Sequence, residues 1–163
     1  MKIKIYLSYI LSGILLVIFL IHLVLFIIGF RFFIVSSGSM EPEIKTGSIA
    51  YVRKVSDKDE FYDRLDFETV LTFRLSNGTV VTHKVIEFDE NLDYIKTQSI
   101  LPNSTEDAPI SFNDVIGVVS FSIPLIGYLL MLLKNWYFWV ISILIIIMVI
   151  IIKSMIKVAK EKK

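Results

Sequence analysis

The hydrophobic positions of this chain gather in two uninterrupted runs that flank a mixed middle region. The first run, residues 5–30, holds 26 residues without a formal charge, and the second, residues 136–152, holds 17. At about 1.5 Å per residue, such runs are long enough to cross a hydrocarbon layer of about 30 Å. The pattern predicts two transmembrane helices, and the second opens with aromatic residues typical of a membrane interface.

Between the two runs, short apolar stretches rich in β-branched and aromatic residues favour strands. The expected strands are residues 32–35, 49–52, 70–75, 79–86, 88–97 (as one strand or two) and 114–121. Asn77 and Gly78 separate two of them and are a strong signal for a tight hairpin. The charged stretch 55–68 is expected to be a solvated excursion. Residues 125–133 are expected to form an interfacial helix, because this apolar stretch is too short to span.

Charge separates the same regions. Residues 31–121 carry 15 of the 16 acidic residues and only nine basic ones, whereas the flanks are basic. The flanking basic residues are Lys2, Lys4, Lys134, Lys153, Lys157, Lys160, Lys162 and Lys163. Because Lys and Arg favour the cytoplasmic side, both termini are predicted to be cytoplasmic and the middle block extracytoplasmic. No basic cluster falls in the middle block, which argues against a nucleic-acid surface.

The expected organisation is an N-terminal start and transmembrane helix (1–30), an extracytoplasmic β-rich domain (31–123), an interfacial apolar segment (124–135), a second transmembrane helix (136–152) and a basic cytoplasmic tail (153–163). A cleavable signal peptide is the alternative for the first run. That run is longer than the 7–15 apolar residues usual in signal peptides, so an anchor is favoured.

With no cysteine and two histidines, thiolate and three-histidine metal sites are excluded, and no metal or cofactor is implied.

A candidate nucleophile lies just after the first run. Ser39 follows Gly38 and precedes Pro42, on a loop that can expose the hydroxyl and present backbone amides to an oxyanion. Of the two histidines, His22 lies inside the first run, where a neutral ring that faces a partner helix or packs against its surroundings is expected. His83 lies on the second strand of the predicted hairpin. Partial burial there would favour the neutral imidazole that a general base requires.

Two motifs in this order resemble a known family. Residues 37–42, Ser-Gly-Ser-Met-Glu-Pro, resemble the nucleophile box of type I signal peptidases. Residues 82–87, Thr-His-Lys-Val-Ile-Glu, are similar to the histidine box of the endoplasmic-reticulum and archaeal branch, which also occurs in some Gram-positive bacteria. Residues 113–119 and 121–124 extend the resemblance, which covers about residues 33–130. It implies a signal-peptidase-like β fold between two transmembrane helices.

The resemblance also implies roles for single residues. Ser39 would be the nucleophile and His83 the general base, and the Ser39 amide and Ser37 hydroxyl would form the oxyanion hole. Asp107 would orient His83, with Glu106 as the alternative acid. The remaining expected roles belong to residues that shape the loop or contact substrate: Met40, Pro42, Phe32 and Ile34.

One segment departs from the family pattern. Where a Gly-Asp pair is expected, residues 97–103 read Thr-Gln-Ser-Ile-Leu-Pro-Asn, so the first acidic residue is missing and a slow or divergent enzyme is left open. Lys84, next to the histidine, is the rival base of a Ser-Lys dyad.

The resulting hypothesis is a membrane-anchored serine endopeptidase that cuts signal peptides from exported preproteins after small residues. The expected partners are preproteins, the lipid bilayer and the translocation machinery. The alternative is a non-catalytic membrane protein whose β domain binds exported partners.

Overall fold

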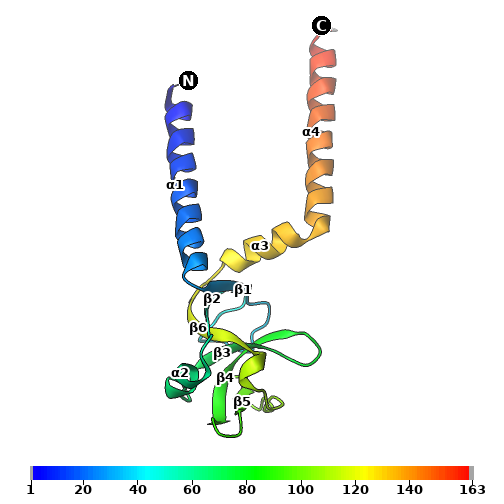
Figure 1. Ribbon diagram of the computed structural model, residues 1–163. Coiled ribbons are helices and arrows are strands. Elements are labelled where there is room, and N and C mark those ends of the chain that lie inside the picture. Colours follow the sequence, from blue (N-terminus) through cyan, green and yellow to red (C-terminus); the bar gives the residue numbers. More distant parts are fainter. Residues whose placement is uncertain (1, 162–163) are drawn as a thin grey trace.

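The computed structural model describes residues 2–161, and side chains from residue 6 to residue 154. It consists of one antiparallel β domain and two long apolar helices that leave the same side of that domain (Figure 1). The lysines at 2, 4, 157, 160, 162 and 163, on which part of the topology prediction rests, lie outside the residues whose side chains are described.

The β domain is a six-stranded sheet in the order β1-β2-β6-β3-β4-β5. Its strands are β1 (Phe30–Ile34), β2 (Ile49–Lys54), β3 (Val70–Arg74), β4 (Val80–Asp89), β5 (Tyr94–Gln98) and β6 (Val115–Ile123), and all neighbours are antiparallel. The predicted hairpin at Asn77 and Gly78 is confirmed, since β3 and β4 pair across this turn. The stretch 88–97 divides, because β4 continues to Asp89 and β5 begins after a short turn.

The expectation of a fully solvated stretch at 55–68 is wrong. It contains a short helix, α2 (Lys58–Asp63), whose N-cap Asp57 accepts a hydrogen bond from the Glu60 N–H at 2.9 Å. The helix turns Phe61 and Tyr62 into the core, where each is 4% exposed. The charged residues of α2 cover its outer face. The stretch 55–68 is polar on average, and this average hid the amphipathic pattern of one short helix.

The main core lies under α2 and the middle of the sheet. Its buried members are Phe61, Tyr62, Leu65, Leu71, Phe73, Val85, Ile95 and Ile110. Val85 and His83 lie on the same face of β4, because alternate residues of a strand share a face. The sheet side chains next to His83 are therefore fixed by close packing.

The two long helices are α1 (Lys2–Ile27) and α4 (Trp136–Glu161). Within them, residues Tyr6–Ile27 and Trp136–Ser154 are long and apolar enough to cross a membrane, and no residue of either segment is fully buried in the chain. Helix α4 continues as helix beyond residue 152, where the basic tail was expected to begin. The short helix α3 (Ile126–Lys134) connects β6 to α4, and a 3-10 turn, η1 (Phe112–Asp114), precedes β6.

Helix α3 packs closely against the loop that joins β1 to β2. A Cβ atom at Gly127 would lie 2.7 Å from both the Gly47 and the Ser48 carbonyl oxygens. The helix can approach the loop backbone this closely only because glycine has no side chain. On its outer side α3 exposes large apolar residues, including Leu129 and Leu132. The loop that carries Ser39 is thereby joined to an apolar surface.

Candidate active site

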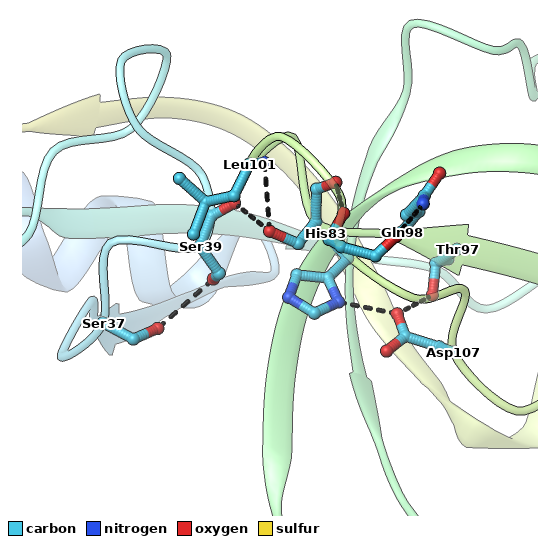
Figure 2. A network of polar contacts seen from close by, with 9 residues as sticks. Ser37, Ser39, His83, Thr97, Gln98, Leu101 and Asp107 are labelled. Atoms are coloured by element: carbon cyan, nitrogen blue, oxygen red, sulfur yellow. Dashed lines mark hydrogen bonds and ion pairs between the residues drawn. The ribbon is translucent and has the colours of Figure 1, made fainter.

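His83 and Asp107 form the most direct side-chain pair of the site. The Asp107 Oδ2 atom lies 2.6 Å from His83 Nδ1, and the two side chains are 18% and 13% exposed (Figure 2). Because a carboxylate only accepts hydrogen bonds, Nδ1 carries the hydrogen in this contact and the neutral ring leaves Nε2 as an acceptor. When the ring is neutral, the nitrogen on the side away from Asp107 is therefore the one free to accept a proton.

Asp107 is held in place by Thr97 of β5. The Thr97 hydroxyl, on a side chain that is 0% exposed, donates to Asp107 Oδ2 at 2.7 Å. The Asp107 N–H donates to the Thr97 carbonyl at 2.9 Å. With backbone and carboxylate both fixed, the acid has little freedom to leave His83.

Glu106, the alternative acid, faces another partner. Its carboxylate lies 2.6 Å from Lys96 Nζ. That hydrogen bond, with the nearby charge, raises the pKa of Lys96. The Asp107 carboxylate thus contacts His83, whereas the Glu106 carboxylate pairs with Lys96, although the two acids are neighbours in sequence.

The loop carrying Ser39 is tied to the segment that follows β5. The Ser39 carbonyl accepts hydrogen bonds from the Ser99 hydroxyl at 2.6 Å and from the Ile100 N–H at 3.1 Å. Gln98, the residue before Ser99, is paired with Lys84, the neighbour of His83 on β4. These contacts bring the Ser39 loop to the strand that bears the histidine.

In Figure 2, the imidazole of His83 lies between Ser39 on one side and Asp107 on the other, with its free nitrogen on the Ser39 side. The Ser39 hydroxyl is paired with the Ser37 hydroxyl at 3.2 Å. Among the described residues, no hydrogen bond joins the Ser39 hydroxyl to His83.

The base of the same loop is pinned by Glu41. Its carboxylate accepts hydrogen bonds from the Thr46 hydroxyl at 2.7 Å and the Thr46 N–H at 2.9 Å. These two bonds hold the pKa of Glu41 below its usual value. Met40 is 1% exposed and supports the loop from inside, whereas Pro42 is exposed. In this conformation a substrate can therefore contact Pro42, whereas Met40 is not accessible to it.

Phe32 and Ile34, the other expected substrate contacts, lie on β1. Phe32 packs edge-on against Tyr51 at 4.9 Å between ring centroids and against His22 at 5.4 Å. His22 also makes a 2.8 Å hydrogen bond with the Tyr51 hydroxyl, so it connects α1 to the β domain. The expectation that His22 is packed holds, but its partner is a strand residue.

Lys84 points to acidic residues. Its ammonium lies 2.6 Å from Glu68 and 3.7 Å from Glu43, and the hydrogen bond to Glu68 raises its pKa above the usual value. A lysine with a raised pKa remains protonated near neutral pH and cannot accept a proton. Its neighbour His83 lies on the opposite face of β4.

Sequence reasoning did not find Thr97 and Ser99 as site residues. Both lie in the segment that departs from the family pattern, and no motif there indicated hydroxyl contacts. The available signal was composition, because 97–99 is a short polar run at the end of a strand.

The chain is 33% identical over 91 residues to signal peptidase I W of Bacillus subtilis (strain 168). The match covers 55% of this chain and 46% of that relative, so it spans about half the length of the curated protein. No family model matches the chain. The similarity supports a relationship with the signal peptidase I family, in agreement with the antiparallel β domain and the two apolar helices.

Proposed function

We propose that this chain is a membrane-anchored serine endopeptidase that removes signal peptides from exported preproteins, with Ser39 as nucleophile and His83 as general base. The observation that carries the proposal is the Asp107–His83 pair, with its free imidazole nitrogen toward the loop that holds Ser39. The similarity to signal peptidase I W supports the proposed substrate class.

The chemistry begins with a rotation of the Ser39 side chain from Ser37 toward His83 Nε2. The imidazole accepts the hydroxyl proton while the Ser39 oxygen attacks the scissile carbonyl, and Asp107 stabilises the imidazolium that forms. Hydrogen bonds from the Ser39 N–H and the Ser37 hydroxyl stabilise the oxyanion. Rotation of Ser39 frees the Ser37 hydroxyl for that task.

His83 then donates its proton to the leaving amine, and the acyl group stays on Ser39. Water then gives a proton to the imidazole while its oxygen attacks the acyl carbonyl. The bond to the Ser39 oxygen breaks as the imidazolium returns the proton to that oxygen, which releases the new carboxylic acid and restores the serine hydroxyl. The Asp107–His83 pair favours this assignment over a Ser-Lys dyad, because Lys84 is held protonated by Glu68.

The placement of the loop supports a substrate embedded in a membrane. Helix α3 contacts Gly47 and Ser48 at one end of the Ser39 loop and exposes apolar side chains on its other side. With α1 and α4 crossing the bilayer, both termini in the cytoplasm and α3 in the interface, Ser39 lies near the outer membrane surface. A signal peptide held by its apolar core presents its cleavage site at a similar height, which favours reaction by proximity.

The experiment is single-turnover cleavage of a preprotein with Ala at the two specificity positions, using the full chain in lipid nanodiscs. Ser39→Ala and His83→Ala should each lower the rate by at least about a thousandfold. Ser36→Ala, at an exposed serine three positions away, is the matched control and should cleave normally. No cleavage by the unaltered chain would favour the non-catalytic binder, and activity that survives His83→Ala but not Lys84→Ala would favour the Ser-Lys dyad.

A further inference from the structure

A histidine inside the first apolar helix makes a polar contact that the proposed chemistry does not use. His22 lies within the segment Tyr6–Ile27, which is long and apolar enough to cross a membrane. Its Nδ1 atom lies 2.8 Å from the Ile18 carbonyl oxygen, and its Nε2 atom lies 2.8 Å from the Tyr51 hydroxyl. Because a carbonyl only accepts, Nδ1 carries the hydrogen and the neutral ring accepts the Tyr51 O–H at Nε2. A polar side chain in such a segment is costly without a partner, and here the partner belongs to the β domain.

Tyr51 is held firmly in the β domain. It is 2% exposed on β2, and its ring stacks on Phe121 of β6 at 4.4 Å between centroids. Phe32 of β1 packs edge-on against both the Tyr51 ring and the His22 ring. The hydroxyl that reaches His22 is therefore carried by a ring that residues of both neighbouring strands hold in place.

The covalent link between α1 and the sheet is short and contains a glycine. Only Ile28 and Gly29 separate α1 from β1, and Gly29 has a φ of 96°, a conformation that other residues rarely adopt. Nothing lies within 4 Å of a Cβ built at Gly29, so that side of the link is open. From residue 9 to residue 27 of α1, no side chain other than His22 forms a hydrogen bond with the β domain.

The position of His22 along α1 gives its contact a long lever arm. Arg31 of β1 lies over the Phe26 ring at 4.5 Å, but Phe26 is within one helical turn of Gly29. His22 is seven residues from Gly29, about 10 Å along the helix axis. A contact at this distance resists a tilt of α1 about Gly29 better than a contact beside the link.

We propose that the hydrogen bond between His22 and Tyr51 fixes the angle between α1 and the β domain, and that this angle sets which peptide bond of a membrane-held preprotein reaches Ser39. The inference rests on the proposed function, because the angle sets the height of Ser39 above the bilayer only if α1 spans it. His22 and Tyr51 are positioning residues, since neither hydrogen-bonds Ser39, His83 or Asp107. A fixed height selects one cleavage site, whereas a variable height lets neighbouring small residues compete.

The angle is measured between nitroxide labels by double electron–electron resonance, on the full chain in lipid nanodiscs. The chain has no cysteine, so Ile10→Cys on α1 and Leu132→Cys on α3, both exposed, give two defined labels. A tilt of about 20° about Gly29 moves residue 10 by about 10 Å, since about 28 Å of helix separate them. We expect the distance distribution to widen at least about twofold in Tyr51→Phe and in His22→Ala.

Tyr51→Phe removes one oxygen and keeps the ring, so it tests the hydrogen bond alone. Adding Tyr51→Phe to His22→Ala should widen the distribution no further, because the hydroxyl has already lost its acceptor. Tyr94→Phe is the matched control, because it removes a tyrosine hydroxyl that bonds Glu87 and lies on β5, the other edge strand. A distribution in Tyr51→Phe as narrow as that of the labelled parent would overturn the proposal, and so would equal widening in Tyr94→Phe.

Site selection is measured on a preprotein with two cleavable sites three residues apart, about 10 Å of extended chain. The ratio of the two products, read by mass spectrometry, should change at least about threefold in Tyr51→Phe. Cleavage of a short soluble peptide in detergent should keep the rate of the parent chain. Widened distances with an unchanged product ratio would overturn the link to site selection. If the parent cleaves neither site, the proposed peptidase fails and site selection with it, while the label distances still decide whether His22 fixes the helix.

Discussion

Replacement of Asp107 by Asn tests whether this carboxylate sets the state of His83. Two hydrogen bonds reach Asp107 Oδ2, from His83 Nδ1 at 2.6 Å and from the Thr97 hydroxyl at 2.7 Å. An amide keeps an acceptor on only one side, and its NH₂ group cannot accept from Nδ1–H. Because both bonds end on Oδ2, an amide oxygen in that position can accept both, and the NH₂ group then takes the place of Oδ1. What the exchange removes is the negative charge that stabilises the imidazolium.

The size of the effect follows from these contacts. A hydrogen bond to a charged group is worth about 1.5–3 kcal/mol, which is about 10- to 150-fold in rate, and the exchange removes that charge. The corresponding exchange in a serine triad lowers kcat by about 10⁴, which sets the upper end of the range. Asp107→Asn is therefore expected to lower kcat by about 10² to 10⁴.

The assay is steady-state and single-turnover cleavage of a peptide substrate by the full chain, together with ¹⁵N NMR of the His83 ring. The NMR spectrum should show a shifted resonance for the His83 Nδ1–H, because its acceptor has lost its charge, and a loss of stability alone does not produce this change. KM should change little, because Asp107 does not contact substrate. Glu106→Gln removes the ion pair with Lys96 and serves as the control, with kcat close to that of the unaltered chain. A kcat for Asp107→Asn within about fivefold of the unaltered chain would refute the reasoning.

Three further predictions concern the loop that carries Ser39. Ser99→Ala removes the hydroxyl that donates to the Ser39 carbonyl, so kcat should fall about two- to tenfold at similar KM in steady-state kinetics. Ser99→Thr should restore much of the rate, and failure to do so would contradict this positioning role. Gly127→Val places a side chain against two carbonyl oxygens 2.7 Å away and should cost about 1–3 kcal/mol, seen as a melting temperature several degrees lower. An unchanged melting temperature would contradict the close helix–loop packing. Glu41 has a pKa below its usual value because Thr46 donates to it, so its contribution to stability is present above the unfolded-state pKa and is lost as the pH falls through the folded-state pKa. Denaturant unfolding of Glu41→Ala and the unaltered chain should therefore differ at pH 7 and converge in acid, and a difference that persists in acid would contradict this linkage.

Local pattern was sufficient for most of the fold. The two apolar runs, the hairpin at Asn77 and Gly78 and most strand positions follow from hydrophobic period and turn chemistry, which act over a few residues. The stretch 55–68 was the exception. Its average polarity concealed one helical turn, and only packing against the sheet turned Phe61 and Tyr62 into the core.

The sequence by itself also determined which residues were candidates for the chemistry, because a serine between flexible residues and a strand histidine are readable from motifs. It could not decide between Asp107 and Glu106, since adjacent residues in a loop differ in direction and not in composition. The tertiary structure decided this by pairing residues 97 and 107 across a loop, which turns one carboxylate to His83 and leaves the other to Lys96.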